Sequence, residues 1–249
     1  GVSGGTMAVV LSIYDPLISA ISNSFSNWKQ LKSQLPFLCC VGAGAILGIG
    51  AFSKLIVLAF ETYPLPTRAF LLGVLIGGIP ILFRSHKNMR LSLSKLISML
   101  TGATIMALFL VVSQIFAAES MHTEPHIIVV AVSCFFAAGA MIIPGISGSL
   151  LLLVLGCYEF VLAAVSDLML SPLAIIGISS LAGVAFCSKL MSSLIKTYPG
   201  FTYYFLIGMI ISSTYALWPS IPHFNQWNLL ILSQPLCILL GYFFTRKLS

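Results

Sequence analysis

Gly145-Ile146-Ser147-Gly148-Ser149, followed by apolar residues and then by Tyr158-Glu159, is the stretch that decides the fold of this chain. The same template occurs as Gly1-Val2-Ser3-Gly4-Gly5, followed by apolar residues and Tyr14-Asp15, at a constant offset of 144 positions. In a hydrophobic chain, a Gly/Ser break before an apolar helix predicts unwound backbone with a helix N-terminus behind it. Two such breaks at matching positions are typical of the central binding site of a transporter.

The composition is that of an integral membrane protein. Hydrophobic residues make up 59% of the chain and charged residues 7%, with a mean hydropathy of +1.07, whereas about a quarter of the residues in a soluble domain are charged. Apolar runs of about 20 residues favour membrane-spanning helices over the shorter alternating strands of a membrane barrel. We therefore expect an all-α protein with a single membrane domain, residues 1–249.

The apolar runs predict how these helices follow one another. Six predicted spans are Leu35–Phe60, Thr67–Phe83, Leu93–Ala117, Pro172–Ile195, Phe201–Trp218 and Leu229–Phe244. Ile127–Ile143, the Gly145 break and Leu150–Val165 predict a helix–break–helix, and the Ser3 break leads into a similar apolar segment, Thr6–Ile21. By analogy, an apolar run comparable to Ile127–Ile143 is expected before Gly1.

Positive charges predict the topology. Lys29 and Lys32 lie in one loop, and a second loop region carries Arg84, Lys87, Arg90 and Lys95, so the positive-inside rule makes both cytoplasmic and places the loop Glu119–Glu124 outside. If the helix–break–helix crossed the membrane once, Arg246 and Lys247 would end outside. If it dips in and returns, they end inside, as does Lys196. The charges therefore favour a re-entrant hairpin, whose unwound tip needs protein or a water-filled cavity around it.

A second set of matches extends the repeat beyond the breaks. Ser53-Lys54-Leu55 and Thr62-Tyr63-Pro64 recur as Ser188-Lys189-Leu190 and Thr197-Tyr198-Pro199, at an offset of 135. Each unit, residues 1–126 and 127–249, then contains one hairpin and three transmembrane helices. Because three is odd, the second unit is upside down relative to the first, which predicts an inverted-topology repeat with both hairpin tips near the midplane.

Two intramembrane lysines are candidate binding residues. Lys54 and Lys189 occupy matched positions inside apolar spans, where a lysine costs about 2.5–3.5 kcal/mol on insertion scales. Each lysine either binds an anion as a point charge or reaches the membrane interface along its long apolar stem.

The two breaks supply the other half of a predicted anion site. Free N–H groups at a helix N-terminus attract anions, and glycines such as Gly4, Gly5 and Gly148 let the backbone approach a ligand closely. Additional hydroxyl donors are Ser3, Thr6, Ser147 and Ser149. A single break is equally consistent with a helix kink, but the duplicated breaks and the lysines together predict an anionic ligand, with phosphate ahead of carboxylate.

Acidic residues follow each break. Asp15 and Glu159 are interpreted as charges near the membrane surface or, alternatively, as a protonatable pair that couples transport to a proton gradient. Tyr14 and Tyr158 beside them are expected to be interface anchors. No cofactor, metal site, catalytic residue or nucleic-acid partner is predicted, and the oligomeric state is left open.

The two break motifs resemble the signatures of the bacterial polyprenyl-phosphate transporter family. The resemblance covers nearly the whole chain and implies a multi-pass protein of the bacterial cytoplasmic membrane. It implies movement of undecaprenyl phosphate, the carrier lipid, from the outer to the inner leaflet for reuse in cell-wall synthesis. Motif residues carried over from the family are Ser3, Gly4, Gly5, Ser147 and Gly148. The second motif departs from the first, because Ser149 and Leu150 replace Gly5 and Thr6.

Two other functions fit parts of the pattern. A transporter of a small anion such as inorganic phosphate would use the same motifs in a site closed to lipid. A membrane lipid phosphatase would need a nucleophile–base pair or a metal site, and neither motif occurs.

Overall fold

The computed structural model describes residues 3–25, 28–84, 90–116, 125–217 and 229–248, and regular structure in these ranges is helical. The helices are α1 (Gly4–Val10), α2 (Tyr14–Ser24), α3 (Trp28–Thr62), α4 (Pro64–Arg84), α5 (Leu93–Phe116), α6 (Ile127–Ala140), α7 (Gly148–Val154), α8 (Tyr158–Ser166), α9 (Leu170–Thr197), α10 (Pro199–Thr214), the 3₁₀ turn η1 (Tyr215–Leu217) and α11 (Leu229–Leu248). Gly1, Lys87, Trp218 and the predicted outer loop Glu119–Glu124 lie outside the described residues.

Five helices of the described ranges are long and apolar enough to cross a membrane. They contain the segments Gln30–Thr62, Pro64–Phe83, Leu93–Ile115, Leu170–Thr197 and Pro199–Leu217, which correspond to five of the six predicted spans. The sixth predicted span is α11, a helix of 20 residues. The chain is therefore a helical, multi-pass membrane protein.

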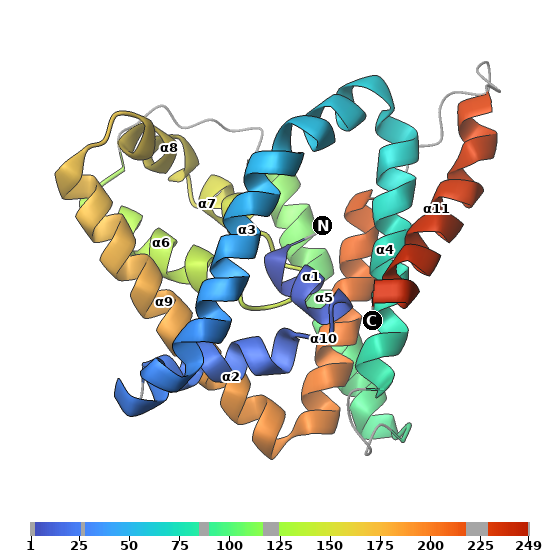
Figure 1. Cartoon of the computed structure of the whole chain (residues 1–249), viewed down its shortest axis with the longest axis horizontal. Helices are drawn as coiled ribbons and strands as arrows, with labels where there is room; N and C mark the ends of the chain where they lie inside the picture. The colour runs from blue at the N-terminus through green and yellow to red at the C-terminus, as the bar shows by residue number, and fades with distance from the viewer. Residues whose placement is uncertain (1–2, 26–27, 85–89, 117–124, 218–228, 249) are drawn as a thin grey trace.

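Most of the helices form two groups in the view of Figure 1, with α1 between them. In this view α6 to α9 lie on the left, α4, α5, α10 and α11 lie on the right, and α1 lies between the groups. The largest buried cluster joins α1 and α2 to α10, through residues such as Val9, Tyr14, Tyr203 and Ile207. Helices α1 and α2 are thus part of the core, because their apolar side chains are buried against α10.

Each post-break segment is two helices rather than one. The chain turns between α7 and α8 by 115°, and α1 and α2 are separated at the matched position. Ser12 and Gly156 lie at the two turns with φ of 58° and 68°, a left-handed conformation that favours glycine. The prediction of one helix over Leu150–Val165 is therefore wrong, because the chain bends after two helical turns. The apolar segment Thr6–Ile21 is likewise divided, into α1 and α2.

Two glycines related by the second offset, of 135 positions, make equivalent packing contacts between helices. An added Cβ at Gly73 of α4 would overlap the Ile238 carbonyl of α11, and one at Gly208 of α10 would overlap the Met99 carbonyl of α5. Small residues at such crossings allow helices to approach closely within a membrane. Both α4–α11 and α5–α10 are therefore tight helix pairs with glycines at matched positions.

Side-chain hydrogen bonds follow the same offset of 135. The Thr67 hydroxyl donates to the carbonyls of Ala59 and Tyr63, at 3.0 and 2.7 Å. The Thr202 hydroxyl donates to those of Leu194 and Tyr198, at 3.1 and 2.9 Å. Local structure thus repeats between the two units, whereas their opposite orientation in a membrane stays a prediction.

Candidate functional site

Both Gly/Ser breaks end in the same helix cap. Ser3 is extended (φ −109°), and its Oγ accepts a hydrogen bond from the Thr6 N–H at 3.3 Å. Ser147 is also extended (φ −97°), and its Oγ accepts from the Leu150 N–H at 3.5 Å. A serine at this position satisfies one N–H group of the first helical turn and fixes where the helix begins. The predicted helix N-termini behind the breaks are therefore present at matched positions.

The two caps face one pocket with a volume of about 410 Å³. Ser3 and Gly4 come from the first break, and Ser147, Gly148 and Ser149 from the second. The remaining lining residues come from α6 to α9 and from the end of α6: Cys134, Ala137, Ala138, Met141, Leu152, Val161, Ile176 and Ser180. The structure thus brings the two motifs together, although 144 residues separate them in the chain.

Hydrogen-bond donors on the two helix ends are available to a ligand. The N–H groups of Gly4 and Gly148 have no hydrogen-bond partner among the described residues, as expected for the first turn of a helix. Ser147 Oγ lies 2.9 Å from Ser149 Oγ, which places two hydroxyls at the second helix end. The pocket therefore combines polar donors at the helix ends with mostly apolar walls.

The two breaks are also bonded to each other. The Gly145 N–H donates to Thr6 Oγ1 at 2.9 Å, and this bond is buried. Gly5 packs against the Met141 carbonyl oxygen, which lies 3.0 Å from where a Cβ would be. Thr6 is 1% exposed, and it does not line the pocket. Thr6 and Gly5 thus join the two motifs from behind the pocket wall.

Tyr14 makes a further contact between the motifs. Its hydroxyl donates to the Ile142 carbonyl at 3.1 Å, and the side chain is 4% exposed. The prediction that Tyr14 is an interface anchor is wrong, because its ring belongs to the buried core. Its hydroxyl bonds to a backbone carbonyl just before the second break. The matched Tyr158 is 37% exposed.

The matched acidic residues differ in their surroundings. Asp15 Oδ2 accepts a hydrogen bond from the Tyr203 hydroxyl of α10. Asp15 Oδ1 is buried and has no hydrogen-bond partner in the described part of the chain, whereas Glu159 is exposed. A buried oxygen without a hydrogen-bond partner is unfavourable, so the two matched acidic residues have different surroundings, and a role for either in proton coupling stays a prediction.

Neither predicted lysine lines the pocket. Lys54 is exposed on α3. Lys189 of α9 is also exposed, and its Nζ donates to the Phe25 carbonyl at the C-terminal end of α2, at 3.4 Å. Ser180 lies in the pocket wall nine residues before Lys189, which is about 14 Å along a helix at about 1.5 Å per residue. The binding role of both lysines stays a prediction, and the contact seen for Lys189 is one that stabilises a helix end.

Sequence reasoning missed the walls of the pocket. Ala137 and Ala138 of α6 and Met141 directly after it contribute apolar surface, and Ser180 of α9 contributes a hydroxyl. The polar pair Ser179-Ser180 inside an apolar span was a usable signal for α9. The α6 residues had none, because small apolar side chains in a membrane helix are equally expected at any packed face.

Comparison with known proteins gives consistent matches. A family profile described as undecaprenyl phosphate translocase-like matches residues 1–228. The chain is 33% identical over 230 residues to a polyprenyl-phosphate transporter of Vibrio cholerae, covering 88% of this chain and 72% of that protein. It is 30% identical over 234 residues to a polyprenyl-phosphate transporter of Staphylococcus aureus, covering 89% and 81%. No solved structure matches the chain.

Proposed function

The chain belongs to the undecaprenyl phosphate translocase-like family, and from this premise we propose that it transports a polyprenyl phosphate through a membrane, with the phosphate bound between the two breaks. The observation that carries the proposal is the single pocket lined by Ser3 and Gly4 on one side and by Ser147, Gly148 and Ser149 on the other. The relatives named in the comparisons are transporters and not enzymes.

The chemistry of the pocket suits a phosphate head group. Two helix ends direct free N–H groups toward it, and their partial positive charge favours an anion. The hydroxyls of Ser3, Ser147 and Ser149 add donors in place of the water that the phosphate loses. Because each helix has only seven residues, we expect the serine hydroxyls and N–H groups, rather than the helix dipoles, to provide most of the binding energy.

The size and walls of the pocket suit an amphiphile. A volume of about 410 Å³ equals roughly fourteen water molecules at about 30 Å³ each, which holds a phosphate and the first part of a prenyl chain. The rest of a long polyprenyl tail lies outside, in lipid. Apolar walls from Ala137, Met141 and Leu152 then face the carbon atoms next to the phosphate.

We propose that transport runs from the outer to the inner leaflet of the bacterial cytoplasmic membrane and returns undecaprenyl phosphate for cell-wall synthesis. This direction follows from the family resemblance. In the mechanism, two inverted units, each a re-entrant hairpin plus three helices, rock against each other around the fixed site. The contacts Thr6–Gly145 and Tyr14–Ile142 hold the two tips together in the conformation described.

Lys54 and Lys189 have a separate place in this proposal. They lie on α3 and α9 and not at the pocket, so we assign them to an earlier or later position of the phosphate along its path. The variant Lys54→Ala/Lys189→Ala is then expected to lose transport while it still binds a lipid phosphate at the two tips. Normal transport by this variant would remove the lysines from the mechanism.

Coupling to a proton gradient is assigned to Asp15. Asp15→Asn keeps the shape of the side chain and its acceptor for Tyr203, but removes the charge. Transport by this variant is expected to become independent of an imposed proton gradient. Glu159→Gln is the matched control, because Glu159 is exposed, and it should leave the dependence unchanged. Equal behaviour of the two variants would contradict the assignment.

The decisive experiment measures binding by purified protein of undecaprenyl phosphate, the uncharged prenol and inorganic phosphate. The test variant is Ser3→Ala/Ser147→Ala, and the control is Ser166→Ala, which removes an exposed hydroxyl on α8. We expect tight binding of the lipid phosphate alone, weakened only in the test variant. Binding of the prenol as tight as that of its phosphate would overturn the anion site.

A small-anion transporter is the second candidate, because the same donors could hold inorganic phosphate. The apolar walls favour the lipid. Equal affinity for inorganic phosphate and for the lipid phosphate in the same experiment would favour the small anion instead.

A further inference from the structure

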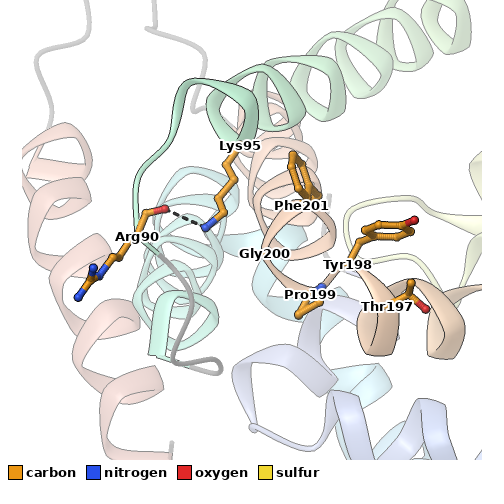
Figure 2. A pocket seen from close by; sticks show the side chains of 7 residues that line it. All are labelled: Arg90, Lys95, Thr197, Tyr198, Pro199, Gly200 and Phe201. Carbon is orange, nitrogen blue, oxygen red and sulfur yellow. Dashed lines mark hydrogen bonds between the residues drawn. The ribbon is translucent and has the colours of Figure 1, made fainter.

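A second pocket, with a volume of about 340 Å³, lies where the chain before α5 meets the junction of α9 and α10 (Figure 2). Its lining residues are Arg90, Lys95, Thr197, Tyr198, Pro199, Gly200 and Phe201. None of them lines the pocket between the two breaks. In Figure 1 the α9–α10 junction is at the bottom of the molecule, whereas α7 and α8 are at the top.

Lysine provides positive charge inside this second pocket. Lys95 Nζ donates to the Arg90 carbonyl oxygen at 3.0 Å, which holds the ammonium group beside the start of α10. Figure 2 shows the Lys95 side chain folded back toward Arg90, while the Arg90 guanidinium extends away from Pro199. No acidic side chain of the described ranges lines the pocket. Lys95 is therefore the central cation, and the exposed Arg90 lies at the rim.

The start of α10 adds donors to the same pocket. Pro199 occupies the first helical position, where its lack of an N–H has no consequence. Gly200 and Phe201 follow in the first turn, whose N–H groups have no partner within the helix. α10 has 16 residues, so its N-terminal partial charge reinforces the attraction that Lys95 exerts on an anion.

The matched position in the other unit lacks these cations. Gly102 of α5 and Gly241 of α11 make equivalent packing contacts, with the Phe205 and Phe70 carbonyls. These two glycines are 139 positions apart, so the position that matches Lys95 is Gln234. The offset of 135 pairs Lys196, next to the pocket, with Glu61. A cationic pocket at one end only agrees with the positive-inside pattern, which assigns this end to the cytoplasmic surface.

Exposed apolar side chains lie close to Lys95, two of them near it in the chain and one in the pocket wall. Leu91 and Leu93, just before Lys95, are 80% and 75% exposed, and Tyr198 is 58% exposed. A charged group with exposed leucines and an aromatic ring beside it is typical of a membrane–water interface. The neighbourhood therefore fits a phosphate attached to a lipid better than a phosphate free in water.

We propose that this pocket binds the phosphate group of an anionic ligand at the cytoplasmic surface, with Lys95 as the main ligand and a membrane lipid as the source of the phosphate. Lipid head groups recognised by basic pockets between helices are one known way in which membrane proteins bind anionic lipids. The site is distinct from the pocket between the breaks, and the proposal does not rest on the transport activity.

The test uses native mass spectrometry of the full chain in detergent, titrated with phosphatidic acid. Phosphatidylcholine is the zwitterionic control lipid, and inorganic phosphate is added as a competitor. The variants are Lys95→Gln and Lys196→Gln. Each removes one positive charge from the same surface, but only Lys95 lines the pocket. Lys95→Arg tests rescue, and Arg90→Gln tests the contribution of the exposed arginine at the rim.

We expect Lys95→Gln to lower the affinity for phosphatidic acid by about tenfold or more, as for loss of a hydrogen bond to a charged group. Lys196→Gln should change it by less than about twofold, as for a screened surface charge, and Lys95→Arg should retain binding. Equal losses in Lys95→Gln and Lys196→Gln, or no loss in either, would overturn the proposal. Displacement of the lipid by inorganic phosphate would identify the free anion as a ligand of the same site, whereas no displacement would assign the site to lipid.

Discussion

Replacement of Thr6 by valine removes one hydroxyl at the junction of the two breaks and almost nothing else. Thr6 Oγ1 accepts from the Gly145 N–H at 2.9 Å and lies 2.9 Å from Ser3 Oγ. Valine has the same shape, but it leaves the buried Gly145 N–H without a partner.

An unsatisfied buried donor costs about 1–3 kcal/mol, which corresponds to a factor of about 5 to 150 in an unfolding equilibrium at about 1.4 kcal/mol per tenfold. Thr6→Ser is the matched comparison. Serine keeps the hydroxyl but removes one buried methyl group, at a cost of about 1 kcal/mol. If the hydrogen bond contributes more to stability than the methyl group, valine is the more destabilising replacement. If the methyl group contributes more, serine is the more destabilising replacement.

The assay is equilibrium unfolding of both variants in the same detergent, together with transport by each in vesicles. We expect the order of stability wild type, Thr6→Ser, Thr6→Val, and we expect transport to fall in the same order. The reverse order of the two variants would refute the view that the bond between the breaks holds the tips together.

Two further predictions use glycine pairs in which one member is packed and the other is open. Gly5→Ala should destabilise the protein by about 1–3 kcal/mol in the same unfolding assay, because the new Cβ would lie 3.0 Å from the Met141 carbonyl oxygen, whereas Gly4→Ala, with nothing within 4 Å, should be neutral. Gly183→Ala should destabilise the protein by at least as much, since its Cβ would overlap the Phe135 carbonyl of α6. At the matched position of α3, Gly48 faces open space, so the Gly48→Ala variant should melt at or slightly above the wild-type temperature.

The break motifs were readable from the sequence because their geometry depends on residue types with few alternatives. Serine caps a helix and glycine allows close approach, so Ser3 and Ser147 marked the helix starts correctly. The helix pairs α4–α11 and α5–α10 were not predicted, because period and hydropathy give the length of a membrane helix and not its neighbour. The glycines Gly73 and Gly208 carried that information, although only as a repeated position.

The second turn of each motif was missed for a different reason. Gly156 is a recognisable turn residue, but its counterpart Ser12 adopts a positive φ that its residue type does not indicate. For Lys54 and Lys189 the sequence contains a signal that the structure does not connect to the pocket. Their repeated positions were visible in the sequence, but repetition alone does not reveal which side of a helix faces a pocket. Tyr14 is buried because it packs against α10, and a local sequence pattern does not show which distant helix a residue contacts.

The differences between the two units bear on how a transporter of this kind changes state. If the units are opposed across the membrane, as proposed, rocking exchanges their roles, and identical units would give two end states of equal energy. The Thr6–Gly145 bond has no counterpart at Leu150, and Asp15 contacts Tyr203 where Glu159 is exposed. A net bond of about 1 kcal/mol favours one state by about fivefold. We therefore propose that these unmatched contacts favour the conformation described, and we expect Thr6→Val to shift the population toward the other.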